Sequence, residues 1–184
     1  IRTTEGSLWL TVPILNNSKK LLNEVKIDNS SSWIYKHKSA IKHNYENSPF
    51  FDKYWNHIEE ILDKSYTKLL ELNIALINYF ISVLKIKTKI IFSSDLNLDS
   101  TGSEKLLDIC KNCNAQIYLS GELGTNYLNE KIFEKEGIQV IFEKFIHPTY
   151  SQKFEEFIPN MSIIDLLFNE GHNSIDILKN SKNY

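Results

Sequence analysis

The chain has 184 residues and a mass of 21.5 kDa, a size typical of a single domain. Hydrophobic residues make up 42% of it, which excludes a disordered protein, and its two cysteines are too few for a disulfide scaffold. A net charge of −2 argues against nucleic acid as a partner, because there is no basic excess to bind phosphates. The longest apolar stretch, residues 74–84, is too short to span a bilayer.

The beginning of the chain carries no targeting signal. It starts with Ile1 rather than methionine, and its polar opening lacks the basic start and apolar core of a secretory signal. We therefore expect a cytoplasmic protein, and a sequence that starts inside a longer chain.

Region 1–32 predicts a short β-hairpin at a sheet edge. Residues 7–12 are rich in aromatic and β-branched side chains and end at Pro13, and residues 24–27 alternate between polar and apolar. Turn-forming residues at 16–18 lie between these two segments.

Region 33–85 predicts three helices. Large side chains recur at every fourth position over 33–45, and this helix ends before Pro49. Two further helical patterns, over 51–64 and 67–84, contain neither glycine nor proline.

Region 86–171 alternates short apolar runs with amphipathic stretches. Strands are predicted over 89–94, 116–121 and 138–142, and helices over 104–113 and 127–135. A last helix follows Pro159, where Ser162 and Asp165 have the spacing of a capping box. The tail, 172–184, is polar and is expected to be frayed.

These patterns predict an α/β fold in one domain, 1–184. Strands that are apolar on both faces and alternate with helices are typical of a parallel sheet. We expect a parallel or mixed sheet with a Rossmann-like βαβαβ half and helices on both faces. The helical segment and the amino-terminal hairpin are additions to that sheet.

Two loops that follow predicted strands carry small polar residues ahead of a helix. The first contains Ser93, Ser94 and Asp95, and the second contains Ser120 and Gly121. Ligands bind beyond the carboxyl ends of parallel strands, and free amides at a helix start favour an anion. We expect a phosphate or carboxylate to bind there. The alternative is that both loops are plain turns and helix caps.

His147 follows the third predicted strand and is expected at the same sheet edge. Histidine exchanges protons near neutral pH, so His147 is the candidate general base. Asp95 would orient it or bind a hydroxyl group. The simpler alternative is an ordinary loop histidine beside Pro148.

Two polar residues lie on apolar helix faces. His37 shares a face with Trp33 and Ile41, and a core histidine bonded to backbone is favoured over a catalytic one. Asn73 needs a partner for its amide, either another loop or a ligand, because burying it unpaired costs about 1 to 3 kcal/mol.

Cys110 and Cys113 form a C-x-x-C pattern inside a predicted helix. There is no second cysteine pair for zinc, and a redox pair would be expected at a helix start, so core packing is favoured. The sequence predicts no metal site and does not identify a cofactor.

Motifs along nearly the whole chain resemble the WbqC-like family of bacterial proteins. They include residues 9–13, 93–96, 118–121, 157–160 and 165–169, in the family's order. The resemblance implies a setting in surface-polysaccharide (O-antigen) gene clusters, and it carries over no catalytic residues. It also implies an additional amino-terminal segment with a central strand.

Setting and site together imply a transferase that modifies a sugar or sugar nucleotide by acyl or aminoacyl transfer. His147 would be the base and Asp95 its orienter, and His37, Asn73 and Tyr150 would line the pocket. The expected partner is a small molecule, a sugar nucleotide or an activated acyl donor. The alternative is a non-catalytic ligand-binding or scaffold subunit of the same pathway. The sequence does not set the oligomeric state.

Overall fold

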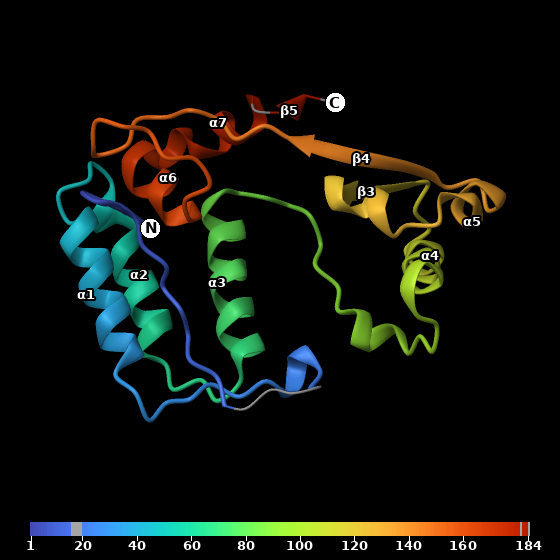
Figure 1. Cartoon of the computed structure of the whole chain (residues 1–184), viewed down its shortest axis with the longest axis horizontal. Coiled ribbons are helices and arrows are strands. Elements are labelled where there is room, and N and C mark those ends of the chain that lie inside the picture. Colours follow the sequence, from blue (N-terminus) through green and yellow to red (C-terminus); the bar gives the residue numbers. More distant parts are fainter. Residues whose placement is uncertain (16–19, 181, 184) are drawn as a thin grey trace. The chain divides into compact units, whose positions relative to one another are not determined.

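The computed structural model describes residues 1–15, 20–180 and 182–183, and the chain divides into two compact units (Figure 1). Unit 1 comprises Ile1–Lys87 and His147–Asn180, and unit 2 comprises Thr88–Ile146 and Ser181–Tyr184. Each unit has its own hydrophobic core. The single domain expected from the chain length stays a prediction. In the described part of the chain, no helix combines the length and the apolarity needed to cross a membrane.

Unit 1 is built mainly from helices. The three helices predicted over 33–85 are confirmed as α1 (Trp33–Tyr45), α2 (Phe51–Asp63) and α3 (Leu69–Val83). The predicted last helix is confirmed as α6 (Ile163–Glu170). Both α1 and α6 pack against α2, so a segment from the carboxyl-terminal part of the chain completes a core begun by the amino-terminal part.

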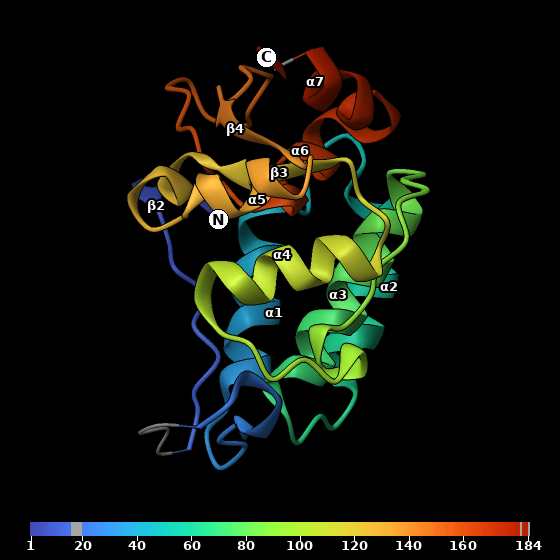
Figure 2. The same cartoon turned by 90° about the vertical axis from the view of Figure 1, so that its right-hand side faces the viewer.

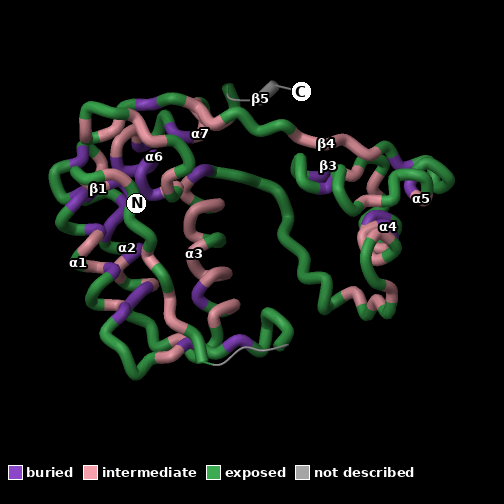
Figure 3. Tube along the Cα trace, viewed as in Figure 1, coloured by how far each residue is buried: buried purple, intermediate pink, exposed green. Residues whose placement is uncertain are grey.

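Aromatic side chains form the centre of the unit 1 core. The Phe168 ring of α6 is fully buried, and its centroid lies 5.3 Å from that of Tyr45 and 5.1 Å from that of Phe51. Phe51 in turn stacks on Trp55. Figure 3 shows buried positions on α1, α2 and α6, whereas α3 is mostly intermediate and has one buried residue, Leu72.

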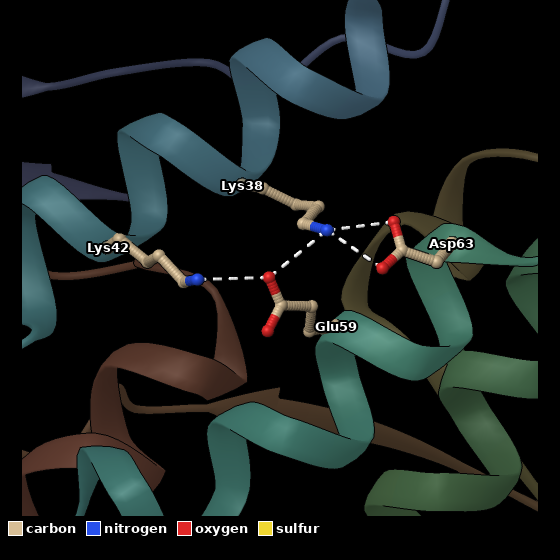
Figure 4. Close-up of polar contacts among 4 residues, drawn as sticks. All are labelled: Lys38, Lys42, Glu59 and Asp63. Atoms are coloured by element: carbon tan, nitrogen blue, oxygen red, sulfur yellow. Dashed lines mark hydrogen bonds and ion pairs between the residues drawn. The ribbon is translucent and has the colours of Figure 1, made fainter.

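An ion-pair network joins α1 to α2 at the surface (Figure 4). The Lys38 ammonium contacts Asp63 at 2.8 Å and Glu59 at 3.1 Å, and Lys42 contacts Glu59 at 3.0 Å. The bond to Asp63 raises the pKa of Lys38, and the bond from Lys42 lowers the pKa of Glu59. These four side chains keep 22% to 53% of their surface in water, and pairs screened in this way contribute little to stability, so packing is the larger contribution that holds the two helices together.

The amino-terminal hairpin is present but shorter and earlier than predicted. It consists of β1 (Arg2–Thr3) paired antiparallel with β2 (Gly6–Ser7). Among the described residues, the segments 7–12 and 24–27 form no ladder with each other; one isolated antiparallel bridge joins Ile14, just beyond the first segment, to Ile27 of the second. The predicted turn at 16–18 lies outside the described residues. A 3-10 helix, η1 (Leu22–Glu24), ends at the first residue of the second segment.

The prediction of a frayed polar tail is wrong for residues 172–180. A 3-10 helix, η4 (Gly171–Asn173), leads into α7 (Ser174–Asn180). Ser174 is fully buried, and its hydroxyl donates a hydrogen bond to the Gly171 carbonyl at 2.7 Å. Ile175 and Leu178 pack against the core. These few apolar side chains anchor a segment whose composition is otherwise polar.

Unit 2 contains one parallel strand pair, β3 (Ile117–Gly121) and β4 (Gln139–Phe145), which lie side by side in Figures 1 and 2. The two predicted strands are therefore confirmed. The remaining elements are η2 (Ser93–Leu96), α4 (Gly102–Asn112), η3 (Glu122–Asn126), α5 (Glu130–Lys135) and β5 (Lys182–Asn183). The strand β5 pairs antiparallel with β4, so the sheet is mixed.

The strand predicted over 89–94 does not form. Residues 86–92 have no helix or strand assignment, and the segment ends in η2. Ile90, Ile91 and Phe92 are each about 40% exposed, at 41%, 41% and 39%. An apolar run becomes a strand only where a neighbour pairs with it, and among the described residues this one has no ladder partner. The full Rossmann-like βαβαβ arrangement is therefore not confirmed.

The core of unit 2 is small and lies on one face of its sheet. Leu107 and Cys110 of α4 pack with Phe133 of α5 and with Ile138, and Tyr118 stacks on Phe133. On the opposite face of β3, Ile117 and Leu119 are 53% and 50% exposed. The predicted coverage of both faces by helices is therefore not confirmed in this unit.

Candidate functional site

A buried carboxylate, Asp165 of α6, organises one end of unit 1. Its two oxygens accept three hydrogen bonds, from the Tyr45 hydroxyl at 2.7 Å, the Tyr150 hydroxyl at 2.8 Å and the Gln152 amide at 2.9 Å. Asp165 has no exposed surface. A buried charge needs such donors, because without them its desolvation is very costly.

The two phenols of this cluster are held as hydrogen-bond donors. Burial is the main cause that raises the pKa of Tyr45 and of Tyr150 far above the ordinary tyrosine value, and the negative charge of Asp165 adds to it. Tyr45 also accepts a hydrogen bond from the Arg2 backbone amide at 2.8 Å. The cluster thus ties β1, α1, α6 and the segment 147–162 together.

A second tie to this segment comes from Arg2, whose side chain is buried. The guanidinium donates to the Glu156 carbonyl at 2.9 Å and lies 5.1 Å from the centre of the Phe154 ring. Further bonds run to the carbonyls of Thr3 and Gly6. The loop that follows His147 is therefore held in place by the Arg2 guanidinium and by the Asp165 carboxylate.

His147 lies in this fixed loop, against two aromatic rings. Its centroid is 6.1 Å from that of Tyr150 and 5.9 Å from that of Phe157. Its Nδ1 is 2.9 Å from the Pro148 carbonyl oxygen. Because a carbonyl can only accept, Nδ1 carries the proton and Nε2 carries the lone pair of the neutral ring. This is the tautomer that a base acting through Nε2 requires.

His37 is a buried histidine that hydrogen-bonds to the backbone, as the interpretation favoured by the sequence predicted. Its Nε2–H donates to the Thr11 carbonyl at 3.2 Å, and its ring packs edge-on against Trp33. Burial lowers its pKa below the ordinary value of 6.5, and the bond to Thr11 offsets part of that shift. The ring is therefore neutral near pH 7. Asn73 is only half-buried on α3.

The other predicted site residues belong to unit 2. Ser93, Ser94 and Asp95 are exposed in η2, and the Ser94 hydroxyl lies 3.3 Å from an Asp95 oxygen. Ser120 is buried at the end of β3, and its hydroxyl donates to the carbonyl of Gly121 at 3.2 Å. The first group is accessible to a ligand, whereas Ser120 is committed to the loop itself.

The loop after β3 is packed so tightly that Gly124 is required there. A Cβ atom built on Gly124 would lie 2.0 Å from the Ser120 hydroxyl oxygen. The close approach explains the glycine at this position.

Of the predicted residues, the structure brings His147 and Tyr150 together in unit 1. The pairing of His147 with Asp95, which belongs to unit 2, stays a prediction.

The capping box expected at the start of α6 is absent. Neither Ser162 before α6 nor Thr101 before α4 makes a side-chain cap hydrogen bond.

The two cysteines differ in burial. Cys110 is buried, and burial raises its pKa, while Cys113 is exposed. Over residues 1–15, 20–180 and 182–183, no group of three His, Cys, Asp or Glu side chains is placed to hold a metal ion.

Sequence reasoning missed the Asp165 cluster. Its signal was an acidic residue inside the apolar run 163–168, which was interpreted as a cap. Its donors Tyr45 and Gln152 lie in other segments, and nothing in the sequence linked them to this carboxylate, which is 120 positions away from Tyr45.

Two hollows adjoin the segment 8–10 of unit 1. The larger, the Asn160 hollow, has a volume of about 560 Å³; the smaller, the His37 hollow, about 380 Å³. The Asn160 hollow is lined by Ile1, Ser7, Leu8, Trp9, Leu10, residues 158–162 and Ile164. The His37 hollow is lined by residues 8–11, Pro13, Ser31, Trp33, Lys36, His37 and Ala40. Both are large enough for part of a small-molecule ligand.

Comparison with known proteins identifies relatives of the whole chain. The WbqC-like protein family matches residues 1–177. The chain is 32% identical over 183 residues to Uncharacterized protein Rv1507c of Mycobacterium tuberculosis, covering 97% of this chain and 79% of that protein. No solved structure matches the chain. The chain belongs to the WbqC-like protein family.

Proposed function

We propose that this protein is a cytoplasmic transferase of bacterial surface-polysaccharide (O-antigen) biosynthesis that modifies a sugar or sugar nucleotide. The transferred group is an acyl or aminoacyl group. Membership of the WbqC-like family supports the setting. The two hollows of unit 1 support a small-molecule substrate, because each could hold part of one.

His147 is the proposed general base. The observation that carries this assignment is the 2.9 Å contact between its Nδ1 and the Pro148 carbonyl, because in the neutral form of the ring it selects the tautomer with the lone pair on Nε2. In the proposed step, the amine nitrogen or hydroxyl oxygen of the sugar attacks the activated acyl carbon, and Nε2 takes the proton that this nucleophile loses. The bond to the leaving group then breaks, and the leaving group departs with its electron pair. Tyr150 and Phe157 hold the ring in place.

Asp95 is proposed to bind a substrate hydroxyl or to orient His147, and Ser93 and Ser94 to contact the substrate with it. Their exposure in η2 is compatible with this role. Gly121 is exposed at the end of β3, where its amide could meet an anion, while Ser120 would act by holding the loop. His37 and Asn73 are proposed as lining residues.

We propose in addition that the βαβ unit of β3, α5 and β4 is part of a larger Rossmann-like sheet. The parallel register of the pair and the half-exposed Ile117 and Leu119 support this, because strands of such sheets are covered on both faces.

Ligand-dependent melting tests the substrate class. Nucleoside diphosphate sugars, ATP and acyl-CoA are added separately to the full-length protein. A true substrate at about 100 times its Kd stabilises the folded state by roughly 2.7 kcal/mol, which raises the Tm. If none of the three changes the Tm, the proposal is wrong.

Variants then test the base. His147→Ala is expected to reduce turnover of the identified substrate by about 10²- to 10⁴-fold. The matched control His43→Ala removes an exposed histidine of α1 and should leave turnover unchanged. Asp95→Asn is compared in the same way with Asp99→Asn. Full turnover in the His147 variant would contradict the assignment, and binding without any turnover would favour the non-catalytic binding subunit.

A further inference from the structure

Trp9 is an anomaly among the three tryptophans of the chain. It is 90% exposed, while Trp33 and Trp55 are 5% and 3% exposed. An indole left in water forgoes the hydrophobic gain of burial, which for a large aromatic side chain exceeds that of most residues. Folding therefore gains little from this ring, and its flat face is available to a ligand.

The position of Trp9 is informative, because it lines both the Asn160 hollow and the His37 hollow. Leu8, Trp9 and Leu10 are the residues common to both linings, so the two hollows adjoin the same short segment. A ligand stacked on the indole could extend into both.

The two hollows differ in their chemistry. The Asn160 hollow contains no charged side chain, although the Ile1 amino group, which donates to the Leu8 carbonyl, belongs to a lining residue; its hydroxyl and amide side chains are those of Ser7, Asn160 and Ser162. None of these three side chains hydrogen-bonds to a described residue. The hollow therefore offers hydroxyl and amide groups to an uncharged polar ligand.

The His37 hollow is positively charged. It contains one cation, Lys36, and no acidic side chain. Lys36 is exposed and makes no ion pair within the described residues. His37 is neutral near pH 7 because burial lowers its pKa. An anionic group of a ligand would therefore be attracted to Lys36 without competition from an internal carboxylate.

We propose that Trp9 is the stacking platform for a phosphorylated pyranose. The C–H face of the sugar ring lies on the indole, its hydroxyls bond to Ser7, Asn160 or Ser162, and its phosphate lies beside Lys36. The electron-rich face of the indole attracts the partly positive C–H groups on that face of the sugar ring. This proposal rests on the proposed function, whose sugar substrate it places at a particular surface.

Tryptophan fluorescence tests the proposal directly, because Trp9 is the exposed tryptophan while the other two are buried. Quenching by acrylamide reports the accessibility of Trp9. Glucose 1-phosphate is expected to protect Trp9 from acrylamide, so that the remaining emission resembles that of the buried pair. Methyl glucoside should protect more weakly, and inorganic phosphate should not protect. Protection by phosphate alone, or none by either sugar, would overturn the proposal.

Affinity measurements on variants separate the two contacts. Trp9→Ala should weaken binding of both sugar probes by about five- to hundredfold. Lys36→Gln should weaken glucose 1-phosphate by about two- to fivefold and leave methyl glucoside unchanged. Tyr35→Ala and Lys64→Gln remove an exposed aromatic ring and an exposed cation that line neither hollow, and they should bind as the parent does. Unchanged affinity in Trp9→Ala contradicts the platform.

The two proposals can fail separately. If a nucleoside diphosphate sugar raises the Tm but leaves Trp9 fully accessible, the platform is wrong and the proposed function stands. If glucose 1-phosphate protects Trp9 while no group transfer occurs with any donor, the platform stands and the transferase is wrong.

Discussion

Units 1 and 2 are held together to very different degrees. In unit 1, 15 buried hydrophobic residues form one cluster among the described residues, and the Asp165 network is buried beside α1 and α6. In unit 2 the corresponding cluster has four buried members, Leu107, Cys110, Phe133 and Ile138. Unit 1 has only about twice as many residues. The difference implies that unit 2 opens more readily, because its buried apolar area is small for its length.

The largest expected effect comes from replacing a fully buried phenylalanine by alanine, in one variant Phe133 of unit 2 and in another Phe168 of unit 1. Each change to alanine costs about 3 to 5 kcal/mol. A unit of roughly 60 residues has only about 3 to 9 kcal/mol to lose. Phe133→Ala should therefore abolish amide protection in β3 and β4 by hydrogen exchange, while Phe168→Ala lowers the unfolding free energy of unit 1.

The control for this pair is Tyr127→Ala, which removes an exposed ring of unit 2. It should leave protection in both strands unchanged. Native protection in Phe133→Ala would show that the small cluster is not what stabilises unit 2.

Asp165→Asn is expected to be the next most damaging change. The amide keeps one acceptor oxygen but places an N–H group against a donor, either a tyrosine hydroxyl or the Gln152 amide. The unfolding free energy of unit 1 should fall by about 2 to 4 kcal/mol, measured by urea denaturation. The exposed Asp176→Asn serves as control, and an equal loss in both variants would refute a special role for the buried network.

Gly171→Ala should destabilise unit 1 by about 2 kcal/mol. Gly171 has φ of +57° and ψ of −121°, and an added Cβ would lie 2.5 Å from the Phe50 ring. Gly102 of unit 2 has a similar φ of +56°, but open space surrounds it. Gly102→Ala should therefore cost about 1 kcal/mol, the backbone part alone. Thermal denaturation that shows equal losses would mean that the Phe50 ring moves aside.

The smallest expected effect is a pH dependence confined to unit 1. The folded pKa of His37 lies below its ordinary value of 6.5, so below that pH the unfolded chain binds a proton that the folded chain resists. Stability is fully present above pH 6.5 and is lost as the pH falls toward the folded pKa. His37→Gln should flatten this part of the stability curve, whereas the exposed His43→Gln should not. A curve unchanged by His37→Gln would exclude this histidine as the cause.

The two units also differ in how far their folds could be predicted. The helices of unit 1 have long apolar repeats, and their bounds agree with the predictions within a few residues. The segment 89–94 was misjudged because an apolar run alone does not supply a pairing partner: no strand pairs with it among the described residues, and Ile90, Ile91 and Phe92 stay exposed. The tail was misjudged because two apolar side chains and a buried serine suffice to anchor α7.

Site prediction was limited for a similar reason. His37 was correctly expected to bond to backbone, since its neighbours one turn away are apolar. Asp165 was overlooked because its partners come from distant segments, and local spacing made it look like a helix cap. Trp9 was placed in a predicted strand and in a family motif, and its exposure was not predicted, because exposure cannot be deduced from the identity of a single residue.

The discontinuity of unit 1 has a consequence for how the protein is made. Tyr45 and its partner Asp165 are 120 positions apart in the chain. Phe51 likewise packs against Phe168, which is synthesised much later. During synthesis, helices α1 to α3 leave the ribosome with their apolar faces uncovered until α6 follows, while all of unit 2 except its last strand is already complete. The nascent chain should therefore depend on chaperones for longer than its high helix content suggests, and it should be most prone to aggregate when translation stalls before α6.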